Sequence, residues 1–524
     1  MHFLIALFVG ALSAFAFQPV GWWPLMPVAI AALCELVVRA GSLKRALTIG
    51  WLFGLGHFAI GLNWIAIAFT FQAAMPAWLG RIAVVLLSLY LAIYPAMAAG
   101  LAHRFGEKSR LALVLALAGG WAITEWLRAT MFTGFAWNSI GVALADTPLI
   151  GGSRLIGTYG LSALVALIGG SLWMMARRDW RPLAAVAAAC LLLWAVPAPR
   201  EVLPTLAPPV RIPGAPGAED IGGSVPMRPI RIVQPNIGQQ DKWRPGFEDE
   251  AYRRLEALTI KGRPMQRLIF WPEAAVTDPL EDARIDAKRY TEEERLRATR
   301  TLASGDLLLT GALSFTSRDG LRVDGATNSV YALEPLGRIV ARYDKAHLVP
   351  YGEYLPMRPL LSAIGLSRLA PGNLDFASGP GPRTIQLPGE WGKVGFQLCY
   401  EIIFSGKVVD RHNRPDFIFN PSNDAWFGRW GPPQHLAQAR LRAAEEGLPV
   451  IRSTPTGISA LVDPHGAIVS SLPWQTAGMI DASMPNPLAP TLFARVGNLI
   501  PLSLGFLLLI VAIALDRRAR YRAI

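Results

Sequence analysis

A cysteine at the end of a short apolar run is the residue of this sequence best suited to chemistry. The run from Val394 to Leu398 predicts a buried strand, and Cys399 follows it directly, with Tyr400 and Glu401 next. A nucleophile has to be held at the end of a rigid element, and its reactive thiolate form needs a base or a positive field beside it. The alternative is a buried structural thiol, because free cysteine is among the most buried residue types.

Two more ionisable residues follow β-like runs further upstream. Glu273 comes after an apolar run and a proline, where a carboxyl is well placed to face a cleft, and Lys345 follows the run that ends at Asp344. A lysine in such a position can stabilise a developing oxyanion. Taken singly, each residue has a simpler interpretation: Glu273 as a helix N-cap or a solvated acid in a turn, and Lys345 as a surface lysine. Their order along the chain with Cys399 makes the three residues candidates for one site.

The composition places much of the chain in lipid. Of its 524 residues, 52% are hydrophobic and only 17% are charged, whereas soluble domains carry about 25% charged residues. Much of the net charge of +12 sits in short clusters between apolar segments, which is a topology signal and not the basic face of a nucleic-acid-binding domain. Three cysteines without Cys-x-x-Cys spacing predict neither a disulfide framework nor a metal site.

Eight apolar segments predict membrane spans, because several approach or exceed the roughly 20 residues that cross a bilayer. Basic clusters follow the second, fourth, sixth and eighth segments, and the intervening loops 18–23 and 72–77 carry no charge. The positive-inside rule then predicts both termini in the cytoplasm, and the long stretch after the seventh segment on the opposite face. The segments are 3–17, 24–38, 47–71, 78–102, 111–130, 159–176, 183–197 and 496–515.

Glu125 and Arg128 lie at the end of the fifth apolar segment. Their spacing of three residues suits an ion pair on one face of a helix. We interpret the pair as structural, and a functional charge at the membrane boundary is the alternative.

The pattern changes after a linker rich in proline and glycine, at residues 200–227. Short β-rich runs then alternate with polar helical stretches, which predicts an α/β domain large enough for its own core. The predicted strands are 230–233, 268–271, 307–309, 329–333, 394–398, 417–419, 450–452 and 459–462, and the predicted helices are about 247–261, 281–304 and 434–446. The predicted domains are a membrane domain of seven helices at 1–199, the linker, the α/β domain at 228–490, a final transmembrane helix at 495–516 and a cytoplasmic tail at 517–524.

In its motifs the chain resembles the apolipoprotein N-acyltransferases, which are membrane-embedded members of the nitrilase superfamily. Members of that superfamily carry a Glu-Lys-Cys triad on an αββα sandwich, and Glu273, Lys345 and Cys399 match it in order. The resemblance extends over nearly the whole chain through FQPVGWWPL, EWLR with ATMFTGFAW, QPNIGQQDKW, KAHLVPYGEYLP, CYEIIF and SNDAWFG. The expected fold is a multi-span α-helical membrane domain joined to an α/β nitrilase-like αββα sandwich.

The resemblance implies a role for each matching residue. Cys399 is expected to be the nucleophile, Glu273 the general base and Lys345 the residue that stabilises the oxyanion. Glu353 matches a second acid that supports the lysine. The residues expected to bind substrate are Trp243, Tyr400, Glu401 and Trp426. Thr456 departs from the family pattern, in which an asparagine is expected.

The resemblance also implies a reaction and a setting. An acyl chain passes from a phospholipid, through a Cys399 thioester, to the N-terminal amine of the diacylglyceryl-cysteine of an apolipoprotein. The implied setting is the bacterial inner membrane, with the catalytic domain on the periplasmic side. The expected partners are the phospholipid, the apolipoprotein and the membrane, with no nucleic acid, no metal and no cofactor, and the default state is a monomer.

Two rival functions are considered beside this one. A membrane-tethered carbon-nitrogen hydrolase, an amidase or nitrilase, would use the same triad on a small substrate. A transporter with a binding domain outside the membrane would need functional charges within its spans, and the predicted spans are mostly devoid of them.

Overall fold

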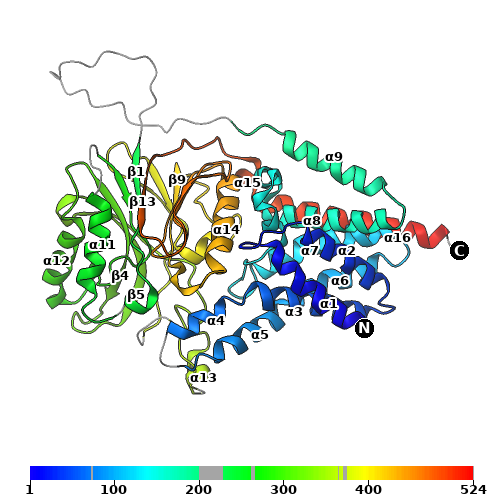
Figure 1. Cartoon of the computed structure of the whole chain (residues 1–524), viewed down its shortest axis with the longest axis horizontal. Coiled ribbons are helices and arrows are strands. Elements are labelled where there is room, and N and C mark those ends of the chain that lie inside the picture. The colour runs from blue at the N-terminus through cyan, green and yellow to red at the C-terminus, as the bar shows by residue number, and fades with distance from the viewer. Residues whose placement is uncertain are drawn as a thin grey trace, which may run out of the picture.

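The computed structural model of the protein describes residues 1–71, 75–199, 228–242, 244–260, 266–363, 365–369 and 374–522. The predicted linker 200–227 and Trp243 lie outside the described residues. The chain forms a bundle of helices joined to an α/β domain, and its last helix returns to the bundle after that domain (Figure 1).

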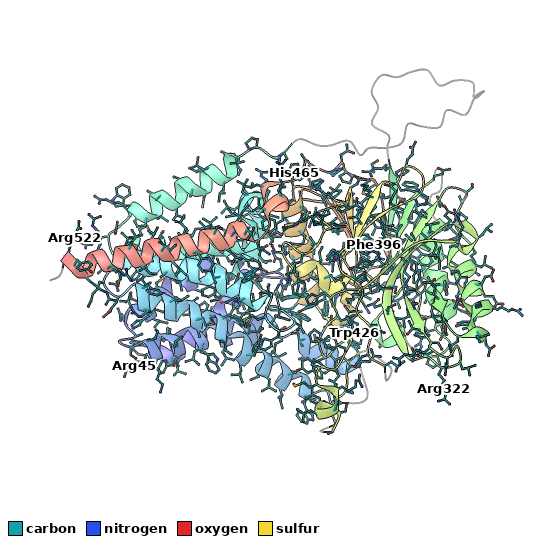
Figure 2. All side chains as sticks on the ribbon, turned by 180° about the vertical axis from the view of Figure 1, so that it is seen from behind. Arg45, Arg322, Phe396, Trp426, His465 and Arg522 are labelled. Atoms are coloured by element: carbon teal, nitrogen blue, oxygen red, sulfur yellow. The ribbon has the colours of Figure 1, made fainter. Side chains whose placement is uncertain are left out.

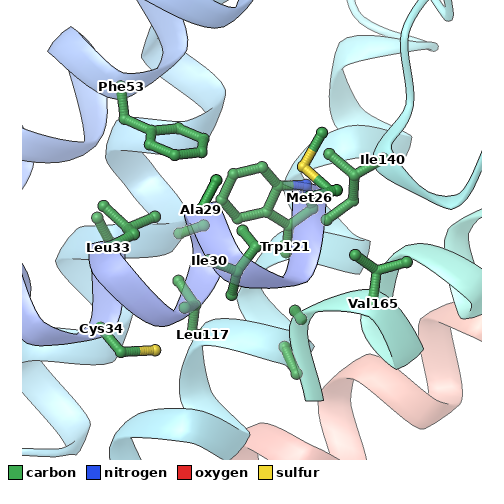
Figure 3. Close-up of a cluster of buried hydrophobic side chains, with 14 of the residues drawn as sticks. Met26, Ala29, Ile30, Leu33, Cys34, Phe53, Leu117, Trp121, Ile140 and Val165 are labelled. Atoms are coloured by element: carbon green, nitrogen blue, oxygen red, sulfur yellow. The ribbon is translucent and has the colours of Figure 1, made fainter. Parts of the chain in front are cut away.

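The bundle is built from apolar helices at both ends of the chain. Its helices are α1 (His2–Ser13), α2 (Leu25–Val38), α3 (Leu43–Gly61), α4 (Ile65–Ala68), α5 (Leu79–Leu91), α6 (Ile93–Phe105), α7 (Arg110–Arg128), α8 (Ser153–Ala176), α9 (Arg181–Ala195) and α16 (Leu499–Arg522). Ile30, Phe53 and Trp121 meet in its core (Figure 3). Small residues let helices approach closely in lipid, and a Cβ at Gly56 of α3 would lie 2.1 Å from a backbone oxygen of α1.

Four helical stretches of the described residues are long and apolar enough to cross a membrane, and the bent pair of α3 with 65–71 makes a fifth. The helices in the other three predicted spans are shorter, and α2 has 14 residues. At a rise of 1.5 Å per residue such a helix reaches about 21 Å, less than the roughly 30 Å of the hydrocarbon core. The four stretches are Leu79–Phe105, Arg110–Arg128, Pro148–Ala176 and Leu499–Arg522.

Two β-sheets form the centre of the α/β domain. Their strands are β1 (Pro229–Gln234), β2 (Leu268–Phe270), β3 (Glu281–Asp282), β4 (Leu307–Thr316), β5 (Gly325–Leu333), β6 (Ile339–Asp344), β7 (Thr384–Gln386), β8 (Lys393–Phe396), β9 (Phe417–Pro421), β10 (Val450–Ser453), β11 (Ala460–Val462), β12 (Ile468–Ser471) and β13 (Gly478–Ser483). The first sheet has the order β13-β1-β2-β4-β5-β6, with β3 paired to β4, and the second has the order β12-β11-β10-β9-β8-β7. The central strands β1, β2 and β4 run parallel, as do β8, β9 and β10.

Helices α11 (Glu248–Ile260) and α12 (Lys288–Thr299) cover the outer face of the first sheet, and α14 (Gly431–Glu446) covers that of the second. The other helices of this part of the chain are α10 (Gln239–Lys242), α13 (Arg358–Ala363) and α15 (Leu492–Val496). Ile230 and Ile232 of β1 meet Phe396 of β8 between the sheets, while Val233 faces the cluster beneath α11 and α12. α14 covers the second sheet and packs against Ile418. The order of layers is helix, sheet, sheet, helix, which confirms the predicted αββα sandwich.

The α/β domain packs directly on the bundle through α14 (Figure 1). Phe58 of α3 and Leu436 of α14 belong to one continuous buried cluster. Across the same boundary, the backbone N–H of Thr158 donates to the carboxylate of Glu445 over 2.6 Å. The two parts of the molecule therefore share a core, so the bundle can position groups in the α/β domain.

Candidate active site

The three residues of the predicted triad each follow a strand, and the sandwich brings those strand ends together. Glu273 follows β2, Lys345 follows β6 directly, and Cys399 opens a short 3₁₀ turn after β8. The Nζ atom of Lys345 lies 3.3 Å from the Glu273 carboxylate, and the charges of both residues act on the Cys399 thiol. Figure 2 shows Phe396, at the end of β8, in the middle of the domain.

A close contact between strands sets the position of Glu273. Gly311 of β4 lies beneath the turn that carries it, and a Cβ on Gly311 would fall 2.7 Å from the Cα of Glu273 and 2.5 Å from the nitrogen of Ala274. Only glycine allows this approach. The general-base candidate is thus positioned by the backbones of two parallel strands.

Lys345 and two carboxylates form a fully buried network. Its ammonium donates to Glu353 over 2.9 Å and to Glu273 over 3.3 Å. The side-chain amide of Asn328, on β5, donates to the same two carboxylates over 2.8 and 2.9 Å. The backbone N–H of Val349 donates to the second oxygen of Glu353. The predicted supporting acid therefore contacts the lysine directly.

Electrostatics keep Lys345 positively charged. Burial alone would lower the pKa of this lysine, but the carboxylates of Glu273 and Glu353 outweigh burial and raise it above its usual value. A group that stays an ammonium cannot take up a proton, so Lys345 is a cation of the site and not its base.

Cys399 is held in a strained backbone conformation. Its φ is +47°, in the left-handed region that non-glycine residues rarely adopt and that clusters at functional sites. The thiol is 5% exposed. Burial and the neighbouring Glu273 carboxylate raise its pKa well above the usual value, against the opposing effects of Lys345 and of a hydrogen bond from the backbone N–H of Asn423. The resting thiol is therefore neutral, and attack requires a proton acceptor beside it.

A buried polar cluster lies behind Cys399. His435 of α14 lies 3.0 Å from the backbone oxygen of Cys399 through Nε2 and 2.9 Å from Asp424 through Nδ1. The guanidinium of Arg452 donates to Asp424 over 2.6 Å. Burial and the charge of Arg452 lower the pKa of His435, which favours the neutral imidazole. Arg452 donates to its Nδ1 atom over 3.0 Å, so Nε2–H is the donor to the Cys399 oxygen, and Arg452 balances the charge of Asp424.

Glu401 is surrounded by protein donors. It accepts hydrogen bonds from the Tyr343 hydroxyl and from the backbone N–H groups of Ala346, His347 and Leu398, over 2.8 to 3.0 Å. Burial raises its pKa to about 7, against these N–H groups. These contacts tie the segment after Lys345 to the turn of Cys399. Its predicted contact with substrate stays a prediction.

Two of the other residues expected to bind substrate have partners in the helical bundle. The Tyr400 hydroxyl donates to the backbone oxygen of Gly134 in the bundle over 3.1 Å. Trp426 is half-buried, and its ring meets that of Phe71 at 5.9 Å, so it lies at the boundary between domain and bundle (Figure 2). Trp243 lies outside the described residues.

Replacing Tyr400 with phenylalanine tests whether its hydroxyl only anchors the turn. We expect the loss of about 1 kcal/mol of stability, the usual net value of one hydrogen bond, and a small loss of activity. Thermal unfolding and turnover would be measured beside Tyr521→Phe, whose side chain is exposed. A hundredfold loss of turnover at unchanged stability would contradict an anchoring role.

Sequence reasoning missed three residues of the site: Asn328, His435 and Lys242. The Nζ atom of Lys242 donates to the backbone oxygen of Glu273 over 3.1 Å. The only signal for Asn328 is an amide within a strand of small, hydroxyl-bearing and apolar residues. His435 and Lys242 stand on helices whose sequences indicate no particular partner.

Two family models match this chain. Residues 9–171 match the family model of the apolipoprotein N-acyltransferase N-terminal domain, and residues 232–489 match that of carbon-nitrogen hydrolase. Among solved structures, Nit3 of Saccharomyces cerevisiae, a member of branch 10 of the nitrilase superfamily, is 17% identical over 49% of this chain and 90% of that chain, with a TM-score of 0.33.

Relatives match over almost the full length. The apolipoprotein N-acyltransferase of Bradyrhizobium diazoefficiens is 36% identical, covering 99% of this chain and 95% of that protein. Those of Rhodopseudomonas palustris and Ralstonia nicotianae are 34% and 33% identical, each covering 98% of this chain and 95% and 94% of those proteins. The chain therefore belongs to the apolipoprotein N-acyltransferase family.

Proposed function

We propose that this protein transfers an acyl chain from a phospholipid to the N-terminal amine of a diacylglyceryl-modified apolipoprotein, through a thioester on Cys399. The observation that carries the proposal is a buried site in which Glu273, Lys345 and Cys399 meet, in a chain that matches acyltransferases throughout. Hydrolysis of a small substrate is not favoured, because the full-length relatives carry the acyltransferase name.

In the first half-reaction, Glu273 takes the thiol proton and the Cys399 sulfur attacks the acyl ester carbon. Lys345 is bonded to two carboxylates at rest. Protonation removes the charge of Glu273, so the field of the lysine becomes available to the thiolate and to the oxyanion. The tetrahedral intermediate collapses when Glu273 returns the proton to the leaving lysophospholipid oxygen, and the thioester remains.

In the second half-reaction, the amine of the apolipoprotein attacks the thioester carbon. Glu273, again a carboxylate, accepts the proton that the amine loses. The carbon–sulfur bond breaks, the thiol of Cys399 regains a proton from Glu273, and the product is an amide. One carboxyl thus serves as base and acid in both half-reactions.

The surface around the site suits a lipid substrate. Met357 and Leu360, at α13, are 66% and 61% exposed, and α13 lies beside α4 and α5 of the bundle (Figure 1). Exposed apolar side chains next to a membrane domain favour entry of substrate from lipid.

We further propose an orientation with the α/β domain in the periplasm and the bundle in the inner membrane. Arg45 and Arg522 lie at the end of the molecule opposite Arg322 of the α/β domain (Figure 2). Basic residues that flank spans favour the cytoplasmic face, which supports this orientation. The proposed state is a monomer.

The test of this function is intact-mass spectrometry of the detergent-purified protein after incubation with phosphatidylethanolamine. We expect an acyl adduct that hydroxylamine removes, and that a diacylglyceryl-cysteine peptide discharges with formation of an N-acyl peptide. Cys399→Ser should form no such adduct, whereas a variant with Cys34→Ala and Cys190→Ala should keep it. An unmodified native protein in the presence of lipid would refute the proposal.

A further inference from the structure

A second lysine lies within the active site. Lys242, the last residue of α10, is 7% exposed. Its Nζ atom donates to the backbone oxygen of Glu273 over 3.1 Å, and this is its one hydrogen-bond acceptor among the described residues. An ammonium carries three protons, and a carbonyl acceptor does not neutralise its charge. A buried cation without a carboxylate of its own is costly, so its position calls for an explanation.

The charges around Cys399 offer an explanation for this buried lysine. Glu273 and Glu353 bring two negative charges and Lys345 brings one positive charge. The remaining charged neighbour of Cys399, Asp424, is paired with Arg452. Without Lys242 the resting site would hold one excess negative charge, which opposes formation of a thiolate and an oxyanion. With Lys242 the charges of Glu273, Glu353, Lys345 and Lys242 sum to zero. Glu401, whose pKa burial raises to about 7, stays outside this balance because protein donors surround its carboxyl group.

We propose that Lys242 is a positioning residue of the active site, which holds the backbone of Glu273 and supplies the second positive charge that favours the Cys399 thiolate. The inference rests on the proposed function only in that Cys399 is the nucleophile. Neither the sequence motifs of the triad nor the family matches assign this role.

The titration of Lys242 agrees with this role. Burial lowers its pKa to about 8, while negative charge on Glu273 and on Cys399 opposes the decrease. At pH 7 the lysine is therefore mostly charged, and a thiolate on Cys399 stabilises that charge further. The lysine and the nucleophile favour each other's ionised forms.

The experiment measures the rate at which iodoacetamide alkylates Cys399 as a function of pH, by intact mass, in a full-length protein with Cys34→Ala and Cys190→Ala. No lipid is present. In Lys242→Met, which keeps the aliphatic stem without the charge, we expect the inflection of the rate to rise by about one to three pH units, and the rate at pH 7 to fall at least about tenfold. The inflection reports the ionisation of Cys399 in the field of its charged neighbours.

Lys242→Gln separates charge from hydrogen bonding, because its amide can still donate to the Glu273 oxygen. It should shift the inflection as Lys242→Met does, and it decides the question alone if the methionine variant does not fold. Arg244→Met, which removes an exposed charge two residues further along the chain, should leave the profile unchanged. A native profile in Lys242→Gln would overturn the electrostatic role.

The outcome is independent of the proposed acyl transfer. A protein that forms no acyl adduct with phospholipid but shows the shifted alkylation profile would contradict the proposed function and leave the role of Lys242 intact. Adduct formation together with an unshifted profile in both variants would support the proposed function and overturn the role of Lys242.

Discussion

Replacing Lys345 with methionine is expected to abolish thioester formation and to destabilise the α/β domain. Glu273 and Glu353 would then face each other across Asn328 without the ammonium that both contact. Removing one partner of a buried charge network typically costs about 3–5 kcal/mol, because the remaining charges stay uncompensated. The free energy is partly recovered when one carboxyl takes up a proton, and a protonated Glu273 no longer serves as a base.

The activity should fall by more than the stability explains. In the proposed mechanism the lysine is the cation that faces the oxyanion, and loss of one such group costs about 10²- to 10³-fold in rate. If Glu273 is protonated in the same variant, the base is lost as well, and the rate falls further. The measurements are the rate of acyl-adduct formation by intact mass and the thermal unfolding of the detergent-purified protein.

Two variants make this prediction specific. Lys393→Met removes a lysine of β8 whose ammonium donates to Asn413 on the exposed surface, and should retain native activity. Glu353→Gln keeps an acceptor for Lys345 and leaves the Glu273–Lys345 pair, so a smaller loss is expected. More than a tenth of the native rate in Lys345→Met would show that the oxyanion is stabilised by other groups.

Local sequence patterns predicted the core strands of the sandwich because buried strands are short apolar runs. They did not predict the boundaries that depend on pairing. The stretch 281–304 was predicted to be one helix, but Glu281–Asp282 pairs with β4 as strand β3 and the helix covers only Lys288–Thr299. A two-residue strand is stabilised by its neighbour in the sheet, and no periodicity within it indicates this.

The residues of the site also fall into two groups, those that local sequence patterns predict and those that they do not. Glu273, Lys345 and Cys399 stand directly after apolar runs, so their positions at strand ends could be predicted. Asn328 and Lys242 contribute through contacts between segments that are far apart in sequence. Hydrogen bonds and charge balance of this kind arise only when the two sheets and α10 are packed together.

The Glu125–Arg128 pair gives the clearest example of a prediction that the structure extends. The spacing predicted an ion pair, and the two side chains are buried with their charged atoms 4.0 Å apart. Arg128 also donates to the backbone oxygens of Phe135 and Trp137 over 2.9 and 2.7 Å, and Glu125 accepts from the backbone N–H of Ile140. The pair therefore fixes the loop that follows α7.

That loop is connected to the turn of Cys399 by two sets of contacts. The backbone oxygen of Gly134 accepts the hydroxyl of Tyr400, next to Cys399. The indole of Trp137 donates to Gln434 of α14 and lies 5.0 Å from the ring of His435, which contacts the backbone oxygen of Cys399. A buried ion pair of the bundle thus positions the strained turn of the α/β domain.

Replacing Arg128 with methionine is therefore expected to slow thioester formation although Arg128 contacts no group of the triad. Three hydrogen bonds from Arg128 to the loop are lost, those to Phe135, Trp137 and Ser139. Glu125 is left without its buried ion-pair partner, at a cost of about 3–5 kcal/mol. Hydrogen exchange should show faster exchange of the amides of 134–140 and of 399–404 together. The rate of acyl-adduct formation should fall, while the amides of α11 and α12 keep their protection.

Arg128→Lys keeps the charge but cannot donate to two carbonyl oxygens with one planar group, so its effect should lie between that of the native protein and that of methionine. Arg39→Met, at an exposed pair of the bundle, should change neither the exchange nor the rate. A freely exchanging loop combined with a native rate would show that the turn of Cys399 is held by the α/β domain alone. If the loop exchanges faster and the rate falls together, the bundle helps to position Cys399. The turn of Cys399 then takes its conformation from contacts on both sides of the boundary between the bundle and the α/β domain.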